Sequence, residues 1–177
     1  ILETAYQLFY ERGFARISMD AVAARAGVTK RTLYNHFTSK DALLGEILKR
    51  QSALAVARIR TWATQQEGTA ADLVESIFAG LEKWSARKRW EGSGFTRLAL
   101  ELADLPGHPA RTAARRHKAT IERVLAGEFR RLGQPHPDAA ARTVVLLTEG
   151  ATILTLIHGD ATYITAAGQT ARVALKL

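Results

Sequence analysis

Residues 17–43 read ISMDAVAARAGVTKRTLYNHFTSKDAL, and this segment predicts two short helices joined by a tight turn. Ser18 is a good N-cap, because its side-chain oxygen can accept a backbone N–H of the first turn. Gly27 is expected to end the first helix, since glycine enters the left-handed conformation at no steric cost. Thr29 is then expected to cap the second helix.

The outward face of that second helix distinguishes the segment from an ordinary helical hairpin. Ala23 is small enough for two helices to cross closely, a glycine follows four positions later, and Leu33 is an apolar anchor six positions beyond the glycine; this is the spacing of a helix-turn-helix. Leu33 and Phe37 face the core at a four-residue spacing. The outward residues are Lys30, Arg31, Thr32, Tyr34 and Asn35. A plain hairpin does not explain a face that is basic, hydroxylated and aromatic, so residues 18–37 predict a DNA-reading motif.

A long helix is expected to follow this motif. Thr38 and Asp41 form a capping-box-like pair at its start. Its apolar stripe extends well past the DNA-reading motif, through Ile59 and Trp62. Such a helix can link two parts of the chain mechanically. Elsewhere helix is again the only state the pattern supports, because no stretch alternates with period two.

These residues resemble the TetR family of one-component transcriptional regulators. The string TLYNHFTSKDALL (32–44) is close to the family pattern of Leu-Tyr-x-His-Phe followed by Lys and an acidic residue, and VAARAGVTKRT (22–32) matches equally well. The resemblance covers residues 1–50 and is loose beyond them. The pattern along the chain predicts an all-α protein of about nine helices. The resemblance implies a three-helix helix-turn-helix DNA-binding domain at 1–46 and a helical ligand-binding and dimerisation domain at 47–177.

The charge distribution agrees with a DNA partner. The chain holds 25 Lys or Arg against 17 Asp or Glu, a formal net charge of +8, which points to a polyanionic partner. Residues 1–60 hold ten Lys or Arg against five acidic residues, whereas the remaining 117 hold fifteen against twelve. The basic excess is therefore concentrated in the expected DNA-binding part, as phosphate contact requires.

Several other classes of function find no support in the sequence. There is no cysteine, so neither a disulfide framework nor a thiolate metal site is expected, and the histidines lack zinc-site spacing. No Ser-His-Asp set, P-loop or dinucleotide fingerprint occurs, so we expect no catalysis and no cofactor. The most apolar stretch, Val144–Ile157, is interrupted by polar residues and is judged too short to cross a bilayer. Because the chain opens inside an amphipathic helix, no signal peptide is expected; we expect a cytoplasmic protein without a membrane partner.

The resemblance also implies which residues contact DNA. Lys30 and Arg31 lie where the family's recognition helix meets base edges, and an arginine can bond O6 and N7 of guanine together. Thr32 can read a base or touch a thymine methyl group. Positions that usually hold the phosphate backbone are occupied by Ser18, Thr29, Tyr34, His36 and Lys40. Asn35 completes the expected set, at a position often aromatic in the family. For each residue the alternative is a solvated side chain or a helix cap.

The C-terminal domain is expected to hold a small molecule. Helical phase suggests a mostly apolar cavity with few polar groups. The candidate lining residues are Phe78, Trp84, Phe95, Leu98, His117, Ile121 and Thr148. Each can instead be plain core, and His117 can be a hydrogen-bonded core histidine.

The helix expected at 138–158 is apolar on most of its circumference, so it must be buried on two sides. The resemblance implies dimerisation through the last two helices as a four-helix bundle. The expected interface residues are Val145, Glu149, Ile153, Ala166 and Ala167. Glu149 is expected to be paired, and the pair can cross the dimer. A monomer with a central buried helix is the alternative.

Together these inferences predict a homodimeric repressor that a small apolar or amphipathic effector releases from a palindromic operator on double-stranded DNA. Whether it represses or activates depends on where the operator lies relative to the promoter. One alternative is an architectural DNA-binding protein without an effector. Another is a small-molecule-binding or catalytic helical domain that carries a helix-turn-helix.

Overall fold

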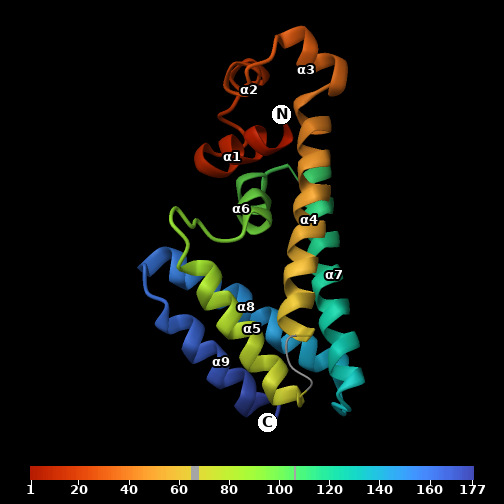
Figure 1. The fold of residues 1–177 in the computed structure, drawn as a ribbon, viewed down its shortest axis with the longest axis vertical. Coiled ribbons are helices and arrows are strands. Elements are labelled where there is room, and N and C mark those ends of the chain that lie inside the picture. The colour runs from red at the N-terminus through yellow and green to blue at the C-terminus, as the bar shows by residue number, and fades with distance from the viewer. Residues whose placement is uncertain (65–67, 106) are drawn as a thin grey trace. The chain divides into compact units, whose positions relative to one another are not determined.

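The computed structural model describes residues 1–64, 68–105 and 107–177, and every regular element within these ranges is an α-helix (Figure 1). The helices are α1 (Leu2–Arg12), α2 (Met19–Ala26), α3 (Lys30–His36), α4 (Lys40–Thr64), α5 (Ala70–Ser85), α6 (Gly94–Glu101), α7 (Pro109–Arg131), α8 (Pro137–His158) and α9 (Thr162–Ala174). The prediction of an all-α chain is confirmed.

Local sequence signals set the boundaries of the first helices. The Ser18 hydroxyl oxygen accepts the Ala21 N–H at 3.2 Å and begins α2. Gly27 ends α2 with φ of 65°, in the left-handed region that favours glycine. The prediction for the start of α4 was wrong by one residue. Ser39, rather than Thr38, accepts a first-turn N–H there, that of Ala42 at 3.0 Å.

The chain divides into two compact units, each built from two segments. Unit 1 comprises Ile1–Leu54 and Ser93–His117, and unit 2 comprises Ala55–Gly92 and Lys118–Leu177. This division does not follow the expected boundary at residues 46/47, because Leu98 of α6 and Ala114 of α7 are buried in the same cluster as the N-terminal helices. The functional division into 1–46 and 47–177 stays a prediction.

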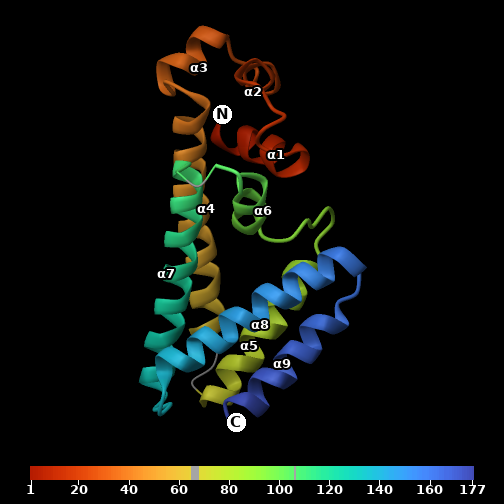
Figure 2. The same cartoon turned by 180° about the vertical axis from the view of Figure 1, so that it is seen from behind.

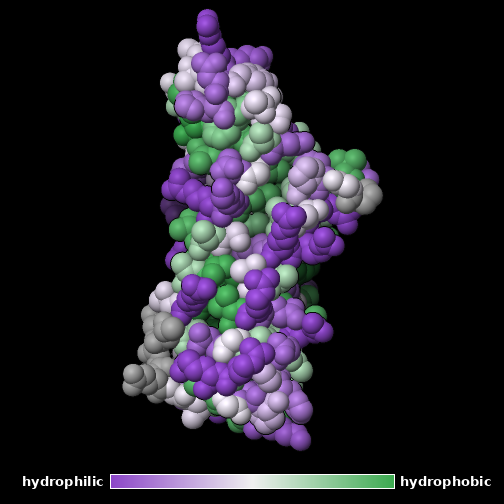
Figure 3. Space-filling view, turned by 90° about the vertical axis from the view of Figure 1, so that its right-hand side faces the viewer, coloured by the Kyte–Doolittle hydropathy of each residue, from purple (hydrophilic) through white to green (hydrophobic). Residues whose placement is uncertain are grey.

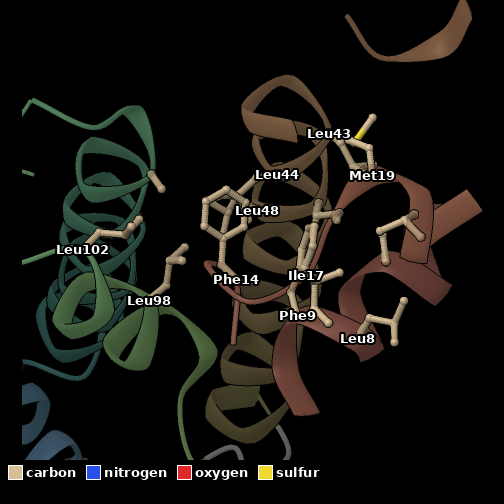
Figure 4. Packing of buried hydrophobic residues seen from close by; sticks show 14 of the residues in the cluster. Leu8, Phe9, Phe14, Ile17, Met19, Leu43, Leu44, Leu48, Leu98 and Leu102 are labelled. Atoms are coloured by element: carbon tan, nitrogen blue, oxygen red, sulfur yellow. The ribbon is translucent and has the colours of Figure 1, made fainter. Parts of the chain in front are cut away.

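The core of unit 1 holds α1 to α3 against the first half of α4 (Figure 4). Its buried side chains include Leu8, Phe9, Phe14, Ile17, Met19, Val22, Leu33, Leu43, Leu44, Ile47 and Leu48, with Leu98 of α6 and Leu102 directly after α6. Burying a side chain of this kind contributes about 1.5–3 kcal/mol. The cluster therefore fixes the orientation of α2 and α3 relative to α4.

In unit 2, α5, α8 and α9 contact one another pairwise (Figure 2). The core of this unit includes Ile77 and Phe78 of α5, Val144 of α8 and Ile164 of α9, together with Phe129 of α7. Gly80 of α5 lies against the ring of Trp62 in α4: a Cβ built at Gly80 would lie 2.4 Å from Trp62 Cδ2. The absence of a side chain at residue 80 allows this close approach of α5 to the α4 indole.

Helix α8 corrects one expectation from the sequence. It is 22 residues long, with a window of mean hydropathy 1.5, so by length and composition it could cross a membrane. The sequence predicts an apolar run, Val144–Ile157, that is interrupted by polar residues and too short to span a bilayer. Helix α8 begins seven residues before that run, at Pro137. Since a core helix of a soluble protein meets the same criteria, one such helix is weak support for a membrane span. About a third of that window, 33%, is buried inside the structure.

Candidate nucleic-acid interface

Helix α3 turns one face to the core of unit 1 and the opposite face to solvent. Leu33 is completely buried, and Phe37 packs against the same cluster. Lys30, Arg31, Asn35 and His36 are exposed, Tyr34 is 42% exposed and Thr32 is half-buried. Figure 3 shows mostly hydrophilic side chains at the top, where Figure 1 places this helix. The outward face predicted from the sequence is therefore present.

The two helices of the motif are capped by hydroxylated residues. Thr29 Oγ1 accepts the Thr32 N–H at 3.0 Å and lies 2.8 Å from Thr32 Oγ1. Ser18 caps α2 in the same way. A capping hydroxyl uses a lone pair for the helix and keeps an O–H that can be donated elsewhere. Ser18 can therefore cap its helix and also contact a phosphate, while the Thr32 hydroxyl is held by Thr29.

Lys30 and Arg31 differ in what they contact. Lys30 Nζ lies 2.9 Å from Asp20 Oδ1, and the hydrogen bond to Asp20 raises the pKa of Lys30 above its ordinary value. The pair is exposed, and exposed pairs are weak enough to exchange partners. Arg31 makes no ion pair with any residue of the described ranges. Its guanidinium is available for a guanine edge without first breaking such a contact.

Lys40, which the resemblance places on the phosphate backbone, makes contacts within unit 1. Its ammonium group donates to the Ala15 carbonyl at 3.3 Å and lies 4.2 Å from the centre of the Phe14 ring. Burial lowers its pKa below the ordinary value. An ammonium group has three donors, so Lys40 can bond Ala15 and a phosphate at the same time. The phosphate contact stays a prediction.

Two α6 residues outside the predicted set contact the end of α1 and the loop that follows it. Arg97 donates to the Tyr10 carbonyl, and Glu101 accepts the backbone N–H groups of Phe14 and Ala15. These contacts join residues 86 or 87 positions apart. No local pattern signals a pairing over that separation.

The candidate effector residues are divided between the units. In unit 1, Phe95 stacks on His117 with ring centroids 3.9 Å apart, and His117 Nδ1 lies 2.9 Å from Ser52 Oγ. His117 is thus a buried, hydrogen-bonded histidine, and Leu98 is buried in the same unit. In unit 2, Phe78 is buried, Trp84 and Ile121 pack against its cluster, and Thr148 donates to the Val145 carbonyl at 3.0 Å. An effector-contacting role stays a prediction for all seven residues.

The candidate dimer residues lie on α8 and α9 of unit 2. Val145 and Ile153 are half-buried, Ala166 is exposed and Ala167 is buried. Glu149 forms an ion pair with Lys118 of the same chain. The exposed large apolar side chains of these helices were not among the predicted interface residues: Leu146, Leu154 and Ile157 on α8 and Val173 on α9. The three on α8 fall within one stripe of that helix by their spacing.

Metal ligands do not cluster in the part of the chain that the structure describes: no group of three or more His, Cys, Asp or Glu side chains there could hold an ion.

Known proteins resemble this chain at two levels. Residues 1–47 match the family described as "Bacterial regulatory proteins, tetR family". Over 60 residues the chain is 40% identical to the HTH-type transcriptional regulator UidR of Escherichia coli K12, a match that covers 34% of this chain and 31% of UidR. It is also 40% identical over 60 residues to the HTH-type transcriptional activator FasR of Mycolicibacterium smegmatis, covering 34% and 27%. The chain thus spans about a third of the length of the curated relatives it matches.

A solved structure extends the similarity over the whole chain. A protein described as a TetR transcriptional regulator, from Streptomyces avermitilis, superposes with a TM-score of 0.83 at 30% sequence identity. The match covers 99% of this chain and 96% of that one. The likeness therefore includes the helices after residue 50, where the sequence resemblance is loose.

Proposed function

The chain belongs to the TetR family of DNA-binding transcriptional regulators, and we propose that it is a homodimeric repressor that a small apolar or amphipathic effector releases from a palindromic operator. The single observation that carries the proposal is the outward face of α3. It presents Arg31, which makes no ion pair with the residues that the structure describes, beside Lys30 and Tyr34 on a helix anchored by the completely buried Leu33. Base contacts of such a face give sequence choice, and the surrounding phosphate contacts give affinity and register.

The exposed apolar side chains of α8 and α9 support the homodimer. Leu146 is 68% exposed, Ile157 67% and Val173 79%. Large apolar side chains gathered on two adjacent helices are typical of a protein interface. A dimer would present two copies of α3 to half-sites about one helical turn, roughly 34 Å, apart. It would act in the cytoplasm, where bacterial DNA lies.

Control by an effector rests on the continuity of α4. This helix begins with Lys40 in unit 1 and ends with Thr64 in unit 2. An effector can change DNA binding only by favouring one of two dimer shapes. A shift of α4 in each subunit would change the spacing of the two α3 helices. Whether the chain represses or activates depends on where its operator lies relative to the promoter; the relative FasR is named an activator.

Selection of bound sequences from randomised duplex DNA tests the proposal. The expected result is an enriched palindrome whose half-sites are about one helical turn apart. Binding that enriches no sequence and weakens as salt rises would contradict the operator proposal. It would support the architectural alternative, because a net charge of +8 is enough for binding to DNA of any sequence. The enriched duplex then serves as the probe for an effector screen, in which its release from the protein is measured.

A further inference from the structure

Helix α6 holds the end of α1 and the following loop through two charged side chains. Arg97 Nη1 donates to the Tyr10 carbonyl at 2.9 Å, and the guanidinium carbon lies 5.2 Å from the centre of the Tyr10 ring. One helical turn later, Glu101 accepts the N–H groups of Phe14 at 3.0 Å and Ala15 at 2.7 Å. Residues four apart lie on the same face of a helix, and both figures of the ribbon show α6 beside α1 (Figures 1 and 2).

The loop backbone is shaped for this carboxylate. Gly13 has φ of 85°, which side chains other than glycine rarely adopt, and a Cβ there would lie 3.1 Å from Glu101 Oε1. Two consecutive backbone N–H groups directed at one anion make charge-assisted hydrogen bonds, which are the stronger kind. Glu101 is the last residue of α6, where a negative charge opposes the helix dipole. Its contacts with the loop, rather than helix formation, account for its position.

The opposite polar groups of the same loop are held by α4. Lys40 donates to the carbonyl of Ala15, whose N–H is bound by Glu101. The Phe14 ring lies under the Lys40 ammonium group and packs edge-on to His108, with ring centroids 5.9 Å apart. Three residues after Ala15, Ser18 ends the loop and caps α2. The loop therefore links the position of α6 to the start of the helix-turn-helix.

We propose that Arg97 and Glu101 form a latch, the α6 latch, that positions the helix-turn-helix for operator binding. By holding the backbone of Phe14 and Ala15, the latch sets where α2 begins at Ser18. The latch rests on the proposed function, because operator binding is its readout.

Glu101→Gln tests the latch. The glutamine oxygen can accept one of the two N–H groups, while its NH₂ group faces the other. We expect the amide exchange of Phe14 and Ala15 to speed up, and operator affinity to fall, each by about tenfold or more. Glu75→Gln on the exposed side of α5 is the matched control. Both substitutions raise the net charge by one, which by itself favours DNA binding.

The comparison of operator with unrelated duplex DNA separates positioning from stability. Release of the latch lowers operator affinity, while the affinity of Glu101→Gln for unrelated duplex stays equal to that of the charge-matched Glu75→Gln control. A purely structural loss lowers the folded fraction and both affinities together, and that result overturns the latch. Unchanged operator affinity in Glu101→Gln, with Phe14 and Ala15 exchanging freely, also overturns it and leaves the proposed function intact. If the wild-type protein selects no preferred sequence from randomised duplex DNA, the proposed function is wrong. The latch is then wrong as well, and no variant is needed to show it.

Discussion

The Lys30 ammonium group at the start of α3 lies 2.9 Å from the Asp20 carboxylate in the first turn of α2. This pair joins the two helices of the DNA-reading motif on their exposed side. A phosphate that binds Lys30 must compete with Asp20, and Asp20 itself repels the DNA backbone. Asp20→Asn is therefore expected to strengthen operator binding by a few-fold, about 2- to 5-fold at low salt.

Binding of labelled operator at two salt concentrations measures this effect. Asp104→Asn in the exposed loop after α6 makes the same change of charge away from the motif. If Asp20→Asn binds the operator more weakly than wild type, the pair positions Lys30 rather than restraining it.

Gly80 is required by the ring of Trp62. Gly80→Ala places a Cβ 2.4 Å from Trp62 Cδ2, so the indole must move. We expect a loss of about 1–3 kcal/mol in the free energy of unfolding from overpacking, measured in urea. Gly127→Ala in α7 is the control, because a Cβ there meets nothing within 4 Å; it should gain about 0.5–1 kcal/mol. An equal increase in the free energy of unfolding in both variants would show that the Trp62 indole can move without destabilising the protein.

The start of α5 should give stability a defined dependence on pH. Asp72 accepts the Thr69 N–H at 2.7 Å and the Thr69 hydroxyl at 2.8 Å, and these bonds lower the pKa of Asp72 below its ordinary value of 3.8. A carboxylate with a lowered folded pKa contributes stability that is fully present above the unfolded value. That contribution disappears as the pH falls through the folded value.

Asp72→Asn should therefore unfold more easily than wild type at pH 7. The difference between the two proteins should shrink as the pH falls below 3.8, the ordinary value for the carboxyl group. Urea unfolding across this range measures it. A difference that stays constant with pH would mean that the charge of Asp72 does not stabilise the cap.

The exposed apolar stripe of α8 predicts the assembly state. Leu146→Gln combined with Ile157→Gln should shift the protein from dimer to monomer, because apolar area buried between subunits contributes to association. Sedimentation at micromolar concentration measures this change. Leu54→Gln on α4 replaces a side chain that is 49% exposed and should leave the dimer intact. A dimer that survives the double substitution would place the interface elsewhere.

Local signals explain which parts of the fold could be predicted. Ser18, Gly27 and Thr29 act within a few residues of themselves, so their caps and the turn follow from the sequence. Thr38 and Ser39 are adjacent hydroxylated residues, and only the path of the backbone decides which one caps α4. Contacts over long separations gave no signal.

The ion pair of Lys118 with Glu149 shows the same limit within unit 2. Helical phase placed Glu149 on an apolar helix and indicated a partner, but the partner lies 31 residues away on another helix. The α6 latch is likewise invisible in the sequence, since Glu101 is one of several acidic residues near a helix end. Tertiary packing, rather than propensity, brings these groups together.

The central claim is that α3 reads bases through Arg31. Wild type and Arg31→Ala should be titrated with the selected operator and with variants that each change one base pair. Wild type should lose about tenfold or more at the base pair that Arg31 contacts, and Arg31→Ala should bind both duplexes at that position equally. If Arg31→Ala discriminates between base pairs as strongly as wild type at every position of the operator, the account is contradicted.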